Sequence, residues 1–303
     1  MRVGVMGGVT EQIIKWLVIS RWWSFYTDFI AVTVGSILAL PKFNMLLYGL
    51  MLVGTISINA FANFMNDIYD FRHGEWDSKR ATVRNPNPIT KKLVGEGALW
   101  NASAVAIMIA ALCGLYIYAV KGPIILFFGI VGVILAYTYS AGKHNIKSLT
   151  LGELVVFFVY GPLMTNAAYF VETGSFGVNA AYTSVIVGIS ITLILFANNI
   201  RDIEADRAIN MKTAAGKLGL GRSVAIFGLL VALMYILLAV FVIASILPIF
   251  SALALLSIPY AIKVNRIMKR KVPDNSAKLM SNLAMLFFVL LSLGILIGYI
   301  LGL

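Results

Sequence analysis

Hydrophobic residues fill nine long stretches of this chain, and polar and charged residues gather in the segments between them. Each stretch is close to the roughly 20 helical residues that cross the hydrocarbon core of a bilayer. We therefore predict an all-α polytopic membrane protein, with nine transmembrane helices in one bundle and residues 1–303 in a single domain. The predicted spans lie at about 22–40, 45–66, 98–120, 122–140, 149–170, 180–199, 223–243, 245–262 and 279–301.

The composition favours a membrane protein over a soluble one. Hydrophobic residues make up 60% of the chain and charged residues 12%, whereas soluble globular domains carry about 25% charged residues. Ahead of the first span, residues Glu11–Trp23 have the pattern of an amphipathic helix that lies at the membrane interface. The single cysteine, Cys113, falls inside an apolar stretch, so we expect a packed thiol and no disulfide within the chain.

The basic residues fall almost entirely on one side of the predicted bundle. The net charge is +11, from 24 Lys and Arg against 13 Asp and Glu. Counting spans from the N-terminus places 22 of the 24 basic residues on the same side, and only Lys42 and Lys121 on the other. Cytoplasmic loops of membrane proteins carry such an excess. We therefore expect a multi-pass protein of the cell membrane with a cytoplasmic N-terminus, and no nucleic acid as a partner.

Acidic residues concentrate at two places, each at the end of a predicted span. Carboxylates are costly at the edge of hydrocarbon, so such a concentration needs a compensating charge. A divalent cation that carries a phosphorylated substrate would supply that charge. On the charge pattern, both places lie on the cytoplasmic face, and we expect an active site there. Seven of the 13 acids lie in or just after these places: Asp67, Asp70, Glu75, Asp77, Asp202, Glu204 and Asp206.

The two acidic motifs occupy equivalent positions in a predicted internal repeat. Asp202 follows Asp67 by about 135 residues, and each ends the second span of a four-span group. Two four-helix repeats followed by one added span would explain this spacing. The polar segments after the motifs are long for a compact protein, so we expect them to cap the mouth of the bundle. The predicted repeat halves are about 22–140 and 149–262, and the predicted cytoplasmic cap loops are about 70–97 and 200–222.

Residues four apart share a face of a helix, and this spacing groups the acids with asparagines. Mg²⁺ takes one or two carboxylates together with substrate phosphates, so two facing acidic helices could hold two ions and clamp one pyrophosphate between them. The acids could instead be surface charges, with the asparagines as interhelical hydrogen bonders, but two matching motifs disfavour that interpretation. The rows are Asn63 with Asp67, Asn66 with Asp70, and Asn198 with Asp202 and Asp206.

Other polar residues lie near the same predicted surface. Tyr139 and Lys143 are four apart at the end of a span, so both could face one cavity, although an interfacial aromatic belt would equally explain the tyrosine. Asp28 is alone in the first span, and an acid that deep should have a partner. Basic residues that could bind a pyrophosphate are Arg72, Lys79, Arg80, Arg84, Lys143, Lys147, Arg201, Arg207 and Lys212.

Several other functional classes fit the sequence less well. The chain has no P-loop, no Gly-x-Gly-x-x-Gly after a strand and no Cys/His set with zinc spacing. A cation-coupled transporter would also have repeats and intramembrane acids, but it would usually place those acids near the bilayer midplane. A membrane phosphotransferase for CDP-alcohols would need a further Asp-Gly and Ala-Arg pattern that the chain lacks.

The motifs resemble those of the UbiA superfamily of intramembrane prenyltransferases, and the resemblance runs over most of the chain. Many members place a further Asp where this chain has Gly74, so Asp77 is a candidate to replace it. The superfamily resemblance rests on Asn66-Asp67-x-x-Asp70 and Asp202-x-x-x-Asp206. Similarity to the MenA-like branch, which prenylates 1,4-dihydroxy-2-naphthoate, rests on Asn198 to Asp206, Asp70-Phe-Arg-His-Gly74, Leu151-Gly-Glu153 and Tyr169-Phe-Val-Glu-Thr-Gly174.

The resemblance implies Mg²⁺-dependent transfer of a polyprenyl group from its pyrophosphate to an aromatic acceptor such as 1,4-dihydroxy-2-naphthoate, through an allylic carbocation, in menaquinone synthesis. Membrane lipids would surround the enzyme, and geranylgeranylglyceryl phosphate is the alternative acceptor. The implied metal ligands are Asn66, Asp67, Asp70, Asp202 and Asp206. The implied substrate-binding residues are Asn63, Asn66, Arg72, Lys143, Asn198 and Arg201, and the implied catalytic residues are Asp70, Asp202, Asp206, Tyr139 and Lys143.

Overall fold

Helices make up the described structure, as the hydrophobic pattern predicts. The computed structural model describes residues 8–72, 87–142, 145–208 and 211–302, and within these ranges no β-strand occurs. Six of the described helices are long and apolar enough to cross a membrane. They are α3 (Met45–Arg72), α4 (Glu96–Lys121), the continuous segment from α6 to α7 (Gly152–Thr173), α8 (Val178–Arg201), α11 (Leu220–Ile243) and α13 (Ser276–Ile300).

Shorter elements precede, connect or interrupt these helices. Near the N-terminus they are α1 (Val9–Ile19), the 3₁₀ turn η1 (Trp22–Ser24) and α2 (Tyr26–Leu38). In the middle of the chain they are α5 (Ile124–Ser140), the 3₁₀ turn η2 (Ile146–Leu149), α6 (Gly152–Phe158), the π-helical segment η3 (Val159–Thr165) and α7 (Asn166–Thr173). Towards the C-terminus they are α9 (Ile203–Ala208), α10 (Ala214–Leu218), the 3₁₀ helix η4 (Ile249–Ser257) and α12 (Ile258–Arg270).

The helix ends follow local sequence signals. Glu96 lies in the first turn of α4, where the helix dipole favours an acid. The same helix is followed by Gly122 at φ 87°, a backbone conformation that glycine adopts without strain. Thr213 caps α10, since its hydroxyl oxygen accepts a hydrogen bond from the backbone N–H of Gly216 at 3.1 Å. These signals set where the membrane helices stop and the polar connections begin.

The described residues confirm an all-helical membrane bundle but do not confirm the count of nine spans. The first predicted span contains α2, which has only 13 residues. The eighth is divided, because Pro248 precedes the tighter 3₁₀ helix η4 and the basic helix α12 follows it. The fifth span holds the π-helical segment η3, where Pro162 lacks the N–H that a regular α-helix needs. The division into two repeats remains a prediction.

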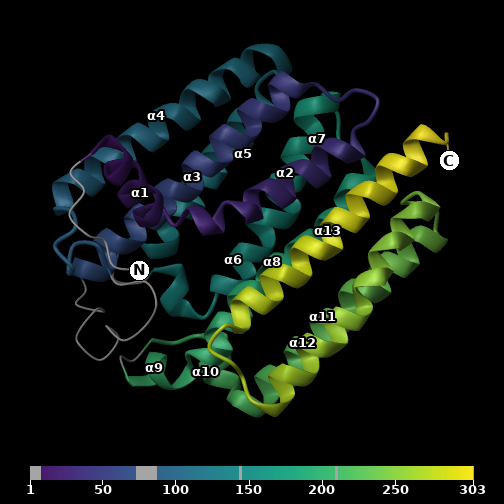
Figure 1. The fold of residues 1–303 in the computed structure, drawn as a ribbon. Helices are drawn as coiled ribbons and strands as arrows, with labels where there is room; N and C mark the ends of the chain where they lie inside the picture. The colour runs from purple at the N-terminus through teal and green to yellow at the C-terminus, as the bar shows by residue number, and fades with distance from the viewer. Residues whose placement is uncertain (1–7, 73–86, 143–144, 209–210, 303) are drawn as a thin grey trace.

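The long helices lie side by side, with α8 in the interior of the bundle (Figure 1). Of the apolar stretch of α8, 72% is buried, against 17% of that of α3. The short helices α9 and α10 lie together at one end of the bundle, and the C-terminus lies at the other (Figure 1). The predicted cap segment 200–222 therefore contains the helices α9 and α10. Residues 73–86 of the other predicted cap segment lie outside the described ranges.

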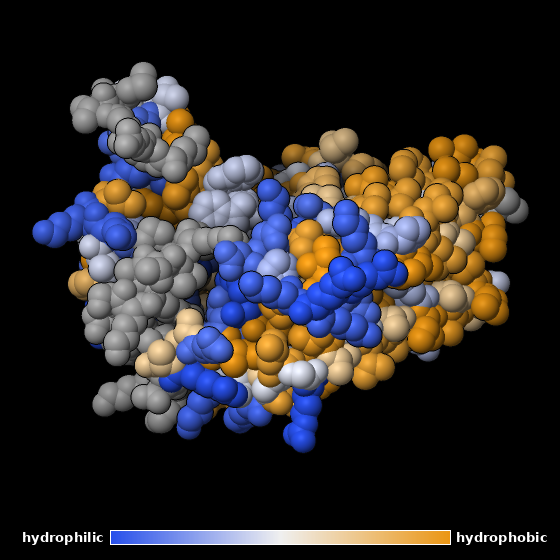
Figure 2. Space-filling view, turned by 60° about the horizontal axis from the view of Figure 1, so that its bottom comes forward, coloured by the Kyte–Doolittle hydropathy of each residue, from blue (hydrophilic) through white to orange (hydrophobic). Residues whose placement is uncertain are grey.

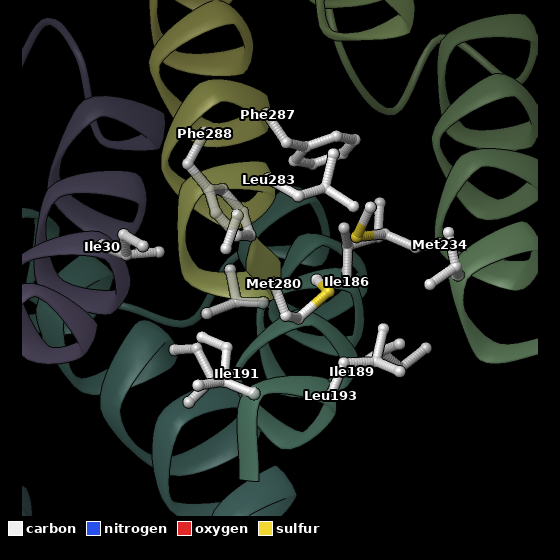
Figure 3. Close-up of a cluster of buried hydrophobic side chains, with 14 of the residues drawn as sticks. Ile30, Ile186, Ile189, Ile191, Leu193, Met234, Met280, Leu283, Phe287 and Phe288 are labelled. Carbon is white, nitrogen blue, oxygen red and sulfur yellow. The ribbon is translucent and has the colours of Figure 1, made fainter. Parts of the chain in front are cut away.

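The main core lies where α8 meets α2, α11 and α13. Figure 3 shows side chains from all four helices converging at this point. Full burial of a large apolar side chain contributes about 1.5–3 kcal/mol in water, but between membrane helices close packing replaces that driving force. Labelled members of the cluster are Ile30 of α2, Ile186, Ile189, Ile191 and Leu193 of α8, Met234 of α11, and Met280, Leu283, Phe287 and Phe288 of α13.

Large apolar side chains cover much of the outer surface. Leu112 of α4 and Leu229 of α11 expose 62% and 68% of their surface, which suits contact with lipid tails. Figure 2 shows hydrophilic residues gathered towards the end that comes forward, beside a broad hydrophobic surface. This distribution and the six apolar helices describe an integral membrane protein.

Two glycines allow α2, η3 and α8 to approach one another closely. A Cβ atom on Gly35 of α2 would lie 2.3 Å from the carbonyl oxygen of Thr165. A Cβ atom on Gly161 of η3 would lie 2.5 Å from the carbonyl oxygen of Ser184 in α8. Small residues at such contacts let membrane helices pack backbone against backbone. The side chains of α2 and η3 are thereby brought to the same part of the bundle.

We predict that Gly35→Ala destabilises the protein by about 1–3 kcal/mol, because the added methyl group forces α2 away from η3. Gly49→Ala on α3 is the matched control, since a Cβ atom there meets nothing within 4 Å and alanine favours a helix by up to about 1 kcal/mol. Thermal unfolding midpoints of both variants in detergent test this. A Gly35→Ala midpoint at or above that of Gly49→Ala would contradict the close packing.

Candidate active site

The two acidic motifs line one cavity in the bundle. Its volume is about 1080 Å³. Asn66 and Asp70 line it from the end of α3, and Asn198 and Asp202 line it from the end of α8. Helix ends about 135 residues apart in the sequence thus supply a shared set of carboxylate and amide oxygens.

A hydrogen-bonded group holds the first motif. Lys147, from η2, forms an ion pair with Asp70 and also donates to Asn66 Oδ1 at 3.2 Å. Asn66 donates from Nδ2 to Asp70 Oδ2 at 3.0 Å, and Ser140 donates from its hydroxyl to Asn66 Oδ1 at 3.0 Å. The side chain of Lys147 is only 11% exposed. Lys147 therefore balances the Asp70 carboxylate and also holds the amide of Asn66 beside it.

Asp67 lies on a different face of α3 and is not among the cavity-lining residues. Arg21 Nη2 contacts its Oδ1 at 2.5 Å, and the Asp67 side chain is 3% exposed. Asn87 donates from Nδ2 to the backbone carbonyl of Asp67 at 2.7 Å. Arg21 itself lines the cavity. The carboxylate of Asp67 thus positions a guanidinium at the cavity.

The second motif spans the junction between α8 and α9. Asp202 lies just after α8, and both of its oxygens accept hydrogen bonds from Arg201, at 2.7 Å from Nε and 2.5 Å from Nη2. Asp202 donates from its backbone N–H to the carbonyl of Asn198, and Asp206 donates likewise to Asp202. Asp206, in α9, is 2% exposed and is not among the cavity-lining residues. Of the predicted row, Asn198 and Asp202 therefore line the cavity and Asp206 does not.

The other predicted site residues are divided. Asn63 and Tyr139 line the cavity. Arg72 does not: it forms an ion pair with Glu96 at 2.5 Å, and its guanidinium lies 5.5 Å from the ring centre of Trp100. Lys143, like the candidate Asp77 and the Gly74 position, lies outside the described residues.

The sequence does not single out the two basic residues that balance the first motif. Lys147 is only one of nine basic candidates, and Arg21 lies in the predicted interfacial segment before the first span and is not a candidate. The available signal was the need of each interfacial carboxylate for a counter-charge. That signal predicts a partner but does not say which one, because η2 and η1 come to α3 only through the tertiary fold.

The carboxylate and amide oxygens at this end of the cavity are suitable ligands for Mg²⁺. Mg²⁺ prefers oxygen ligands and is usually bound by one or two carboxylates together with waters and substrate phosphates. Asp70 and Asp202 offer the carboxylates, and Asn66 and Asn198 offer amide oxygens. No group of three or more Asp, Glu, His or Cys in the described part of the chain could hold an ion by itself. The arrangement fits an ion that is completed by substrate rather than one enclosed by protein.

Comparison with known sequences gives a family. The UbiA prenyltransferase family matches residues 29–300. The chain is 27% identical over 278 residues to the 1,4-dihydroxy-2-naphthoate octaprenyltransferase of Bacillus subtilis (strain 168), which covers 90% of this chain and 89% of that protein. It is 30% identical over 209 residues to UbiA prenyltransferase domain-containing protein 1 of Dictyostelium discoideum, a match that spans 66% of this chain and 62% of that protein.

Solved structures share the fold. A UbiA homolog from Aeropyrum pernix K1 superimposes with a TM-score of 0.71 at 18% identity, over 90% of this chain and 97% of that chain. A UbiA homolog from Archaeoglobus fulgidus bound to GPP and Mg²⁺ gives 0.69 at 15% identity, over 93% and 99%. A digeranylgeranylglyceryl phosphate synthase gives 0.63 at 16% identity, over 95% and 98%. The predicted superfamily is confirmed: the chain is a member of the UbiA prenyltransferase family.

Proposed function

We propose that this protein transfers a polyprenyl group from its pyrophosphate to an aromatic acceptor such as 1,4-dihydroxy-2-naphthoate, with Mg²⁺ as cofactor. The observation that carries the proposal is the shared cavity, with Asp70 and Asp202 at one end and a largely apolar lining elsewhere. Similarity to the B. subtilis octaprenyltransferase over 90% of the chain supports this choice of acceptor. The archaeal homolog bound to GPP and Mg²⁺ supports the choice of donor and cofactor.

The pyrophosphate would bind at the end of the cavity that holds the acidic motifs and the basic residues paired with them. Asn66, Asp70, Asn198 and Asp202 would hold Mg²⁺. Asp67 and Asp206, predicted as further ligands, do not line the cavity, and Asp67 would instead position Arg21. The chemistry that bound Mg²⁺ supplies is stabilisation of pyrophosphate as a leaving group. Two ions are proposed, one for each motif.

The basic residues of the site would change partners when the substrate binds. Lys147 and Arg201 now neutralise Asp70 and Asp202, and both line the cavity, as Arg21 does. With Mg²⁺ bound at the two carboxylates, Lys147 and Arg201 would donate to phosphate oxygens, whose geometry suits the planar guanidinium of arginine. Charge is then balanced both before and after binding.

The remaining cavity residues would act on the prenyl group and the acceptor, which are the carbon-containing reactants. The bond between the allylic carbon and the pyrophosphate oxygen breaks, and its electron pair leaves with the pyrophosphate. Tyr139 would shield the resulting allylic cation with the face of its ring. An electron-rich ring carbon of the acceptor then forms the new carbon–carbon bond, and the group that this carbon carried, a proton or a carboxylate released as CO₂, leaves so that the ring stays aromatic. The apolar lining would hold the prenyl tail and exclude water from the cation.

The proposed site faces the cytoplasm, because the basic loops predict that side for the motif-bearing helix ends. Geranylgeranylglyceryl phosphate is the second candidate acceptor. The similarity in fold to a digeranylgeranylglyceryl phosphate synthase favours keeping it, since that structure covers 95% of this chain.

We predict that Asp70→Asn and Asp202→Asn each lower turnover by at least about 100-fold. Removing a residue that only hydrogen-bonds to a metal ligand already costs up to about 100-fold, and these two residues are proposed to bind the metal directly. Glu204→Gln is the matched control: Glu204 is an exposed acid within the second motif that does not line the cavity. Rates are measured with labelled polyprenyl pyrophosphate, and circular dichroism checks the fold. Undiminished turnover in either Asp variant would refute the metal site.

We further predict that purified protein consumes labelled polyprenyl pyrophosphate only with Mg²⁺ and an aromatic acceptor, that chelation stops the reaction and that added Mg²⁺ restores it. The acceptor panel contains 1,4-dihydroxy-2-naphthoate, 4-hydroxybenzoate and geranylgeranylglyceryl phosphate. Preference for geranylgeranylglyceryl phosphate would indicate that the protein acts in ether-lipid synthesis instead. Ion flux in liposomes with no prenyl transfer would support a transporter instead.

A further inference from the structure

One buried carboxyl in the cavity lies outside the proposed metal site. Asp28, in the first turn of α2, has no exposed surface, yet it lines the cavity. Asn59 donates from Nδ2 to Asp28 Oδ2 at 2.5 Å. Asp28 Oδ1 has no hydrogen-bond partner within the described ranges, and no basic side chain there pairs with it. A buried carboxyl oxygen that lacks a donor is unfavourable, so this atom suits a donor from outside the chain.

Polar neighbours hold this carboxyl in place. Asn59 Nδ2 also reaches the hydroxyl oxygen of Tyr160 in η3 at 3.2 Å. Asn59 Oδ1 accepts a hydrogen bond from Asn63 Nδ2 at 3.0 Å. All four residues line the same cavity. Both N–H groups of the Asn59 amide are thus used, and Asp28 Oδ1 is left as a cavity-lining residue's acceptor without a donor.

This polar group lies deeper in the bundle than the metal site. Asn59 precedes Asn66 by seven residues on α3, which is about 10 Å along a helix axis. Asn63 lies between them on the same helix and donates a hydrogen bond to Asn59. A second substrate could therefore occupy the deeper level while the pyrophosphate occupies the outer one.

Another part of the cavity lining is apolar and suits the prenyl tail. Met51 and Gly54 of α3, Cys113 and Ile117 of α4, and Phe128 of α5 contribute to it. A hydrocarbon tail has no donor to offer Asp28, so tail and carboxyl should occupy different parts of the cavity.

We propose that Asp28, positioned by Asn59 beside Tyr160, binds the aromatic acceptor by accepting a hydrogen bond from one of its ring hydroxyls. This inference rests on the proposed function. It also fixes how a hydroxylated naphthoate lies. Its carboxylate avoids Asp28, since like charges repel strongly at low dielectric, and turns towards Lys147 and Arg201. The hydroxyl faces α2, and the ring lies between the two levels.

The test compares acceptor kinetics of Asp28→Leu and Asp28→Asn with those of Glu172→Gln, using the full chain in detergent. Glu172 is the matched control: it is 3% exposed, lies on a membrane helix and also has an unpartnered oxygen, but it does not line the cavity. We expect Asp28→Leu to lower kcat/KM for 1,4-dihydroxy-2-naphthoate about tenfold or more. The KM for polyprenyl pyrophosphate should stay within about twofold, and Glu172→Gln should match wild type.

The two monomethyl ethers of the acceptor separate binding from a structural role. Wild type should discriminate against one ether about tenfold or more, because methylation removes the donor that Asp28 accepts. Asp28→Leu should lose that discrimination, and Asp28→Asn serves if the leucine variant does not fold. Equal discrimination in wild type and variant, or an unchanged kcat/KM in the variant, overturns the inference while the proposed function stands. Wild-type protein that prenylates no aromatic acceptor overturns both.

Discussion

Carboxylates at the edge of a membrane must be neutralised, and the site of this protein depends on that constraint. Asp67, Asp70 and Asp202 each pair with a basic residue: Arg21 before η1, Lys147 in η2 and Arg201 at the end of α8. Two of these pairs join segments that are far apart in the chain, because Arg21 and Lys147 both pair with acids of α3. The need for a counter-charge therefore also holds η1 and η2 against α3. It places three basic groups on the wall of one cavity. In the proposed function, a pyrophosphate with its metal ions would exchange partners with these pairs, so that each charged side chain keeps a counter-charge.

Packing determines what lies beneath the charged end. Glycine contacts at Gly35 and Gly161 bring α2 and η3 together with α8, and Asp28 and Tyr160 therefore line the same cavity. The charged end suits a pyrophosphate, the apolar lining suits a prenyl tail, and the carboxyl of Asp28 suits a hydroxylated ring. Because these surfaces belong to different helices, donor and acceptor binding are expected to respond to different substitutions.

The sequence predicted the long helices well because α3, α8 and α13 carry long apolar runs with few charged residues. It was less accurate where backbone geometry overrides hydrophobicity. Arg21 has φ 57° and begins a turn rather than a span, and Pro248 precedes a 3₁₀ helix. The shared cavity followed from the spacing of the motifs. The partners of Asp67 and Asp70 could not be predicted. Arg21 is not among the nine basic candidates, and only the fold selects Lys147 from them.

The central claim is that both motifs act on one ligand. Equilibrium binding of an unreactive polyprenyl pyrophosphate analogue, with Mg²⁺ present, tests it in wild type, the two single Asp→Asn variants at 70 and 202, and the double variant. If α3 and α8 share a site, each single substitution weakens binding about tenfold or more, and the double variant binds little worse than either single one. Losses that multiply in the double variant, or a single variant that binds like wild type, would contradict a shared site.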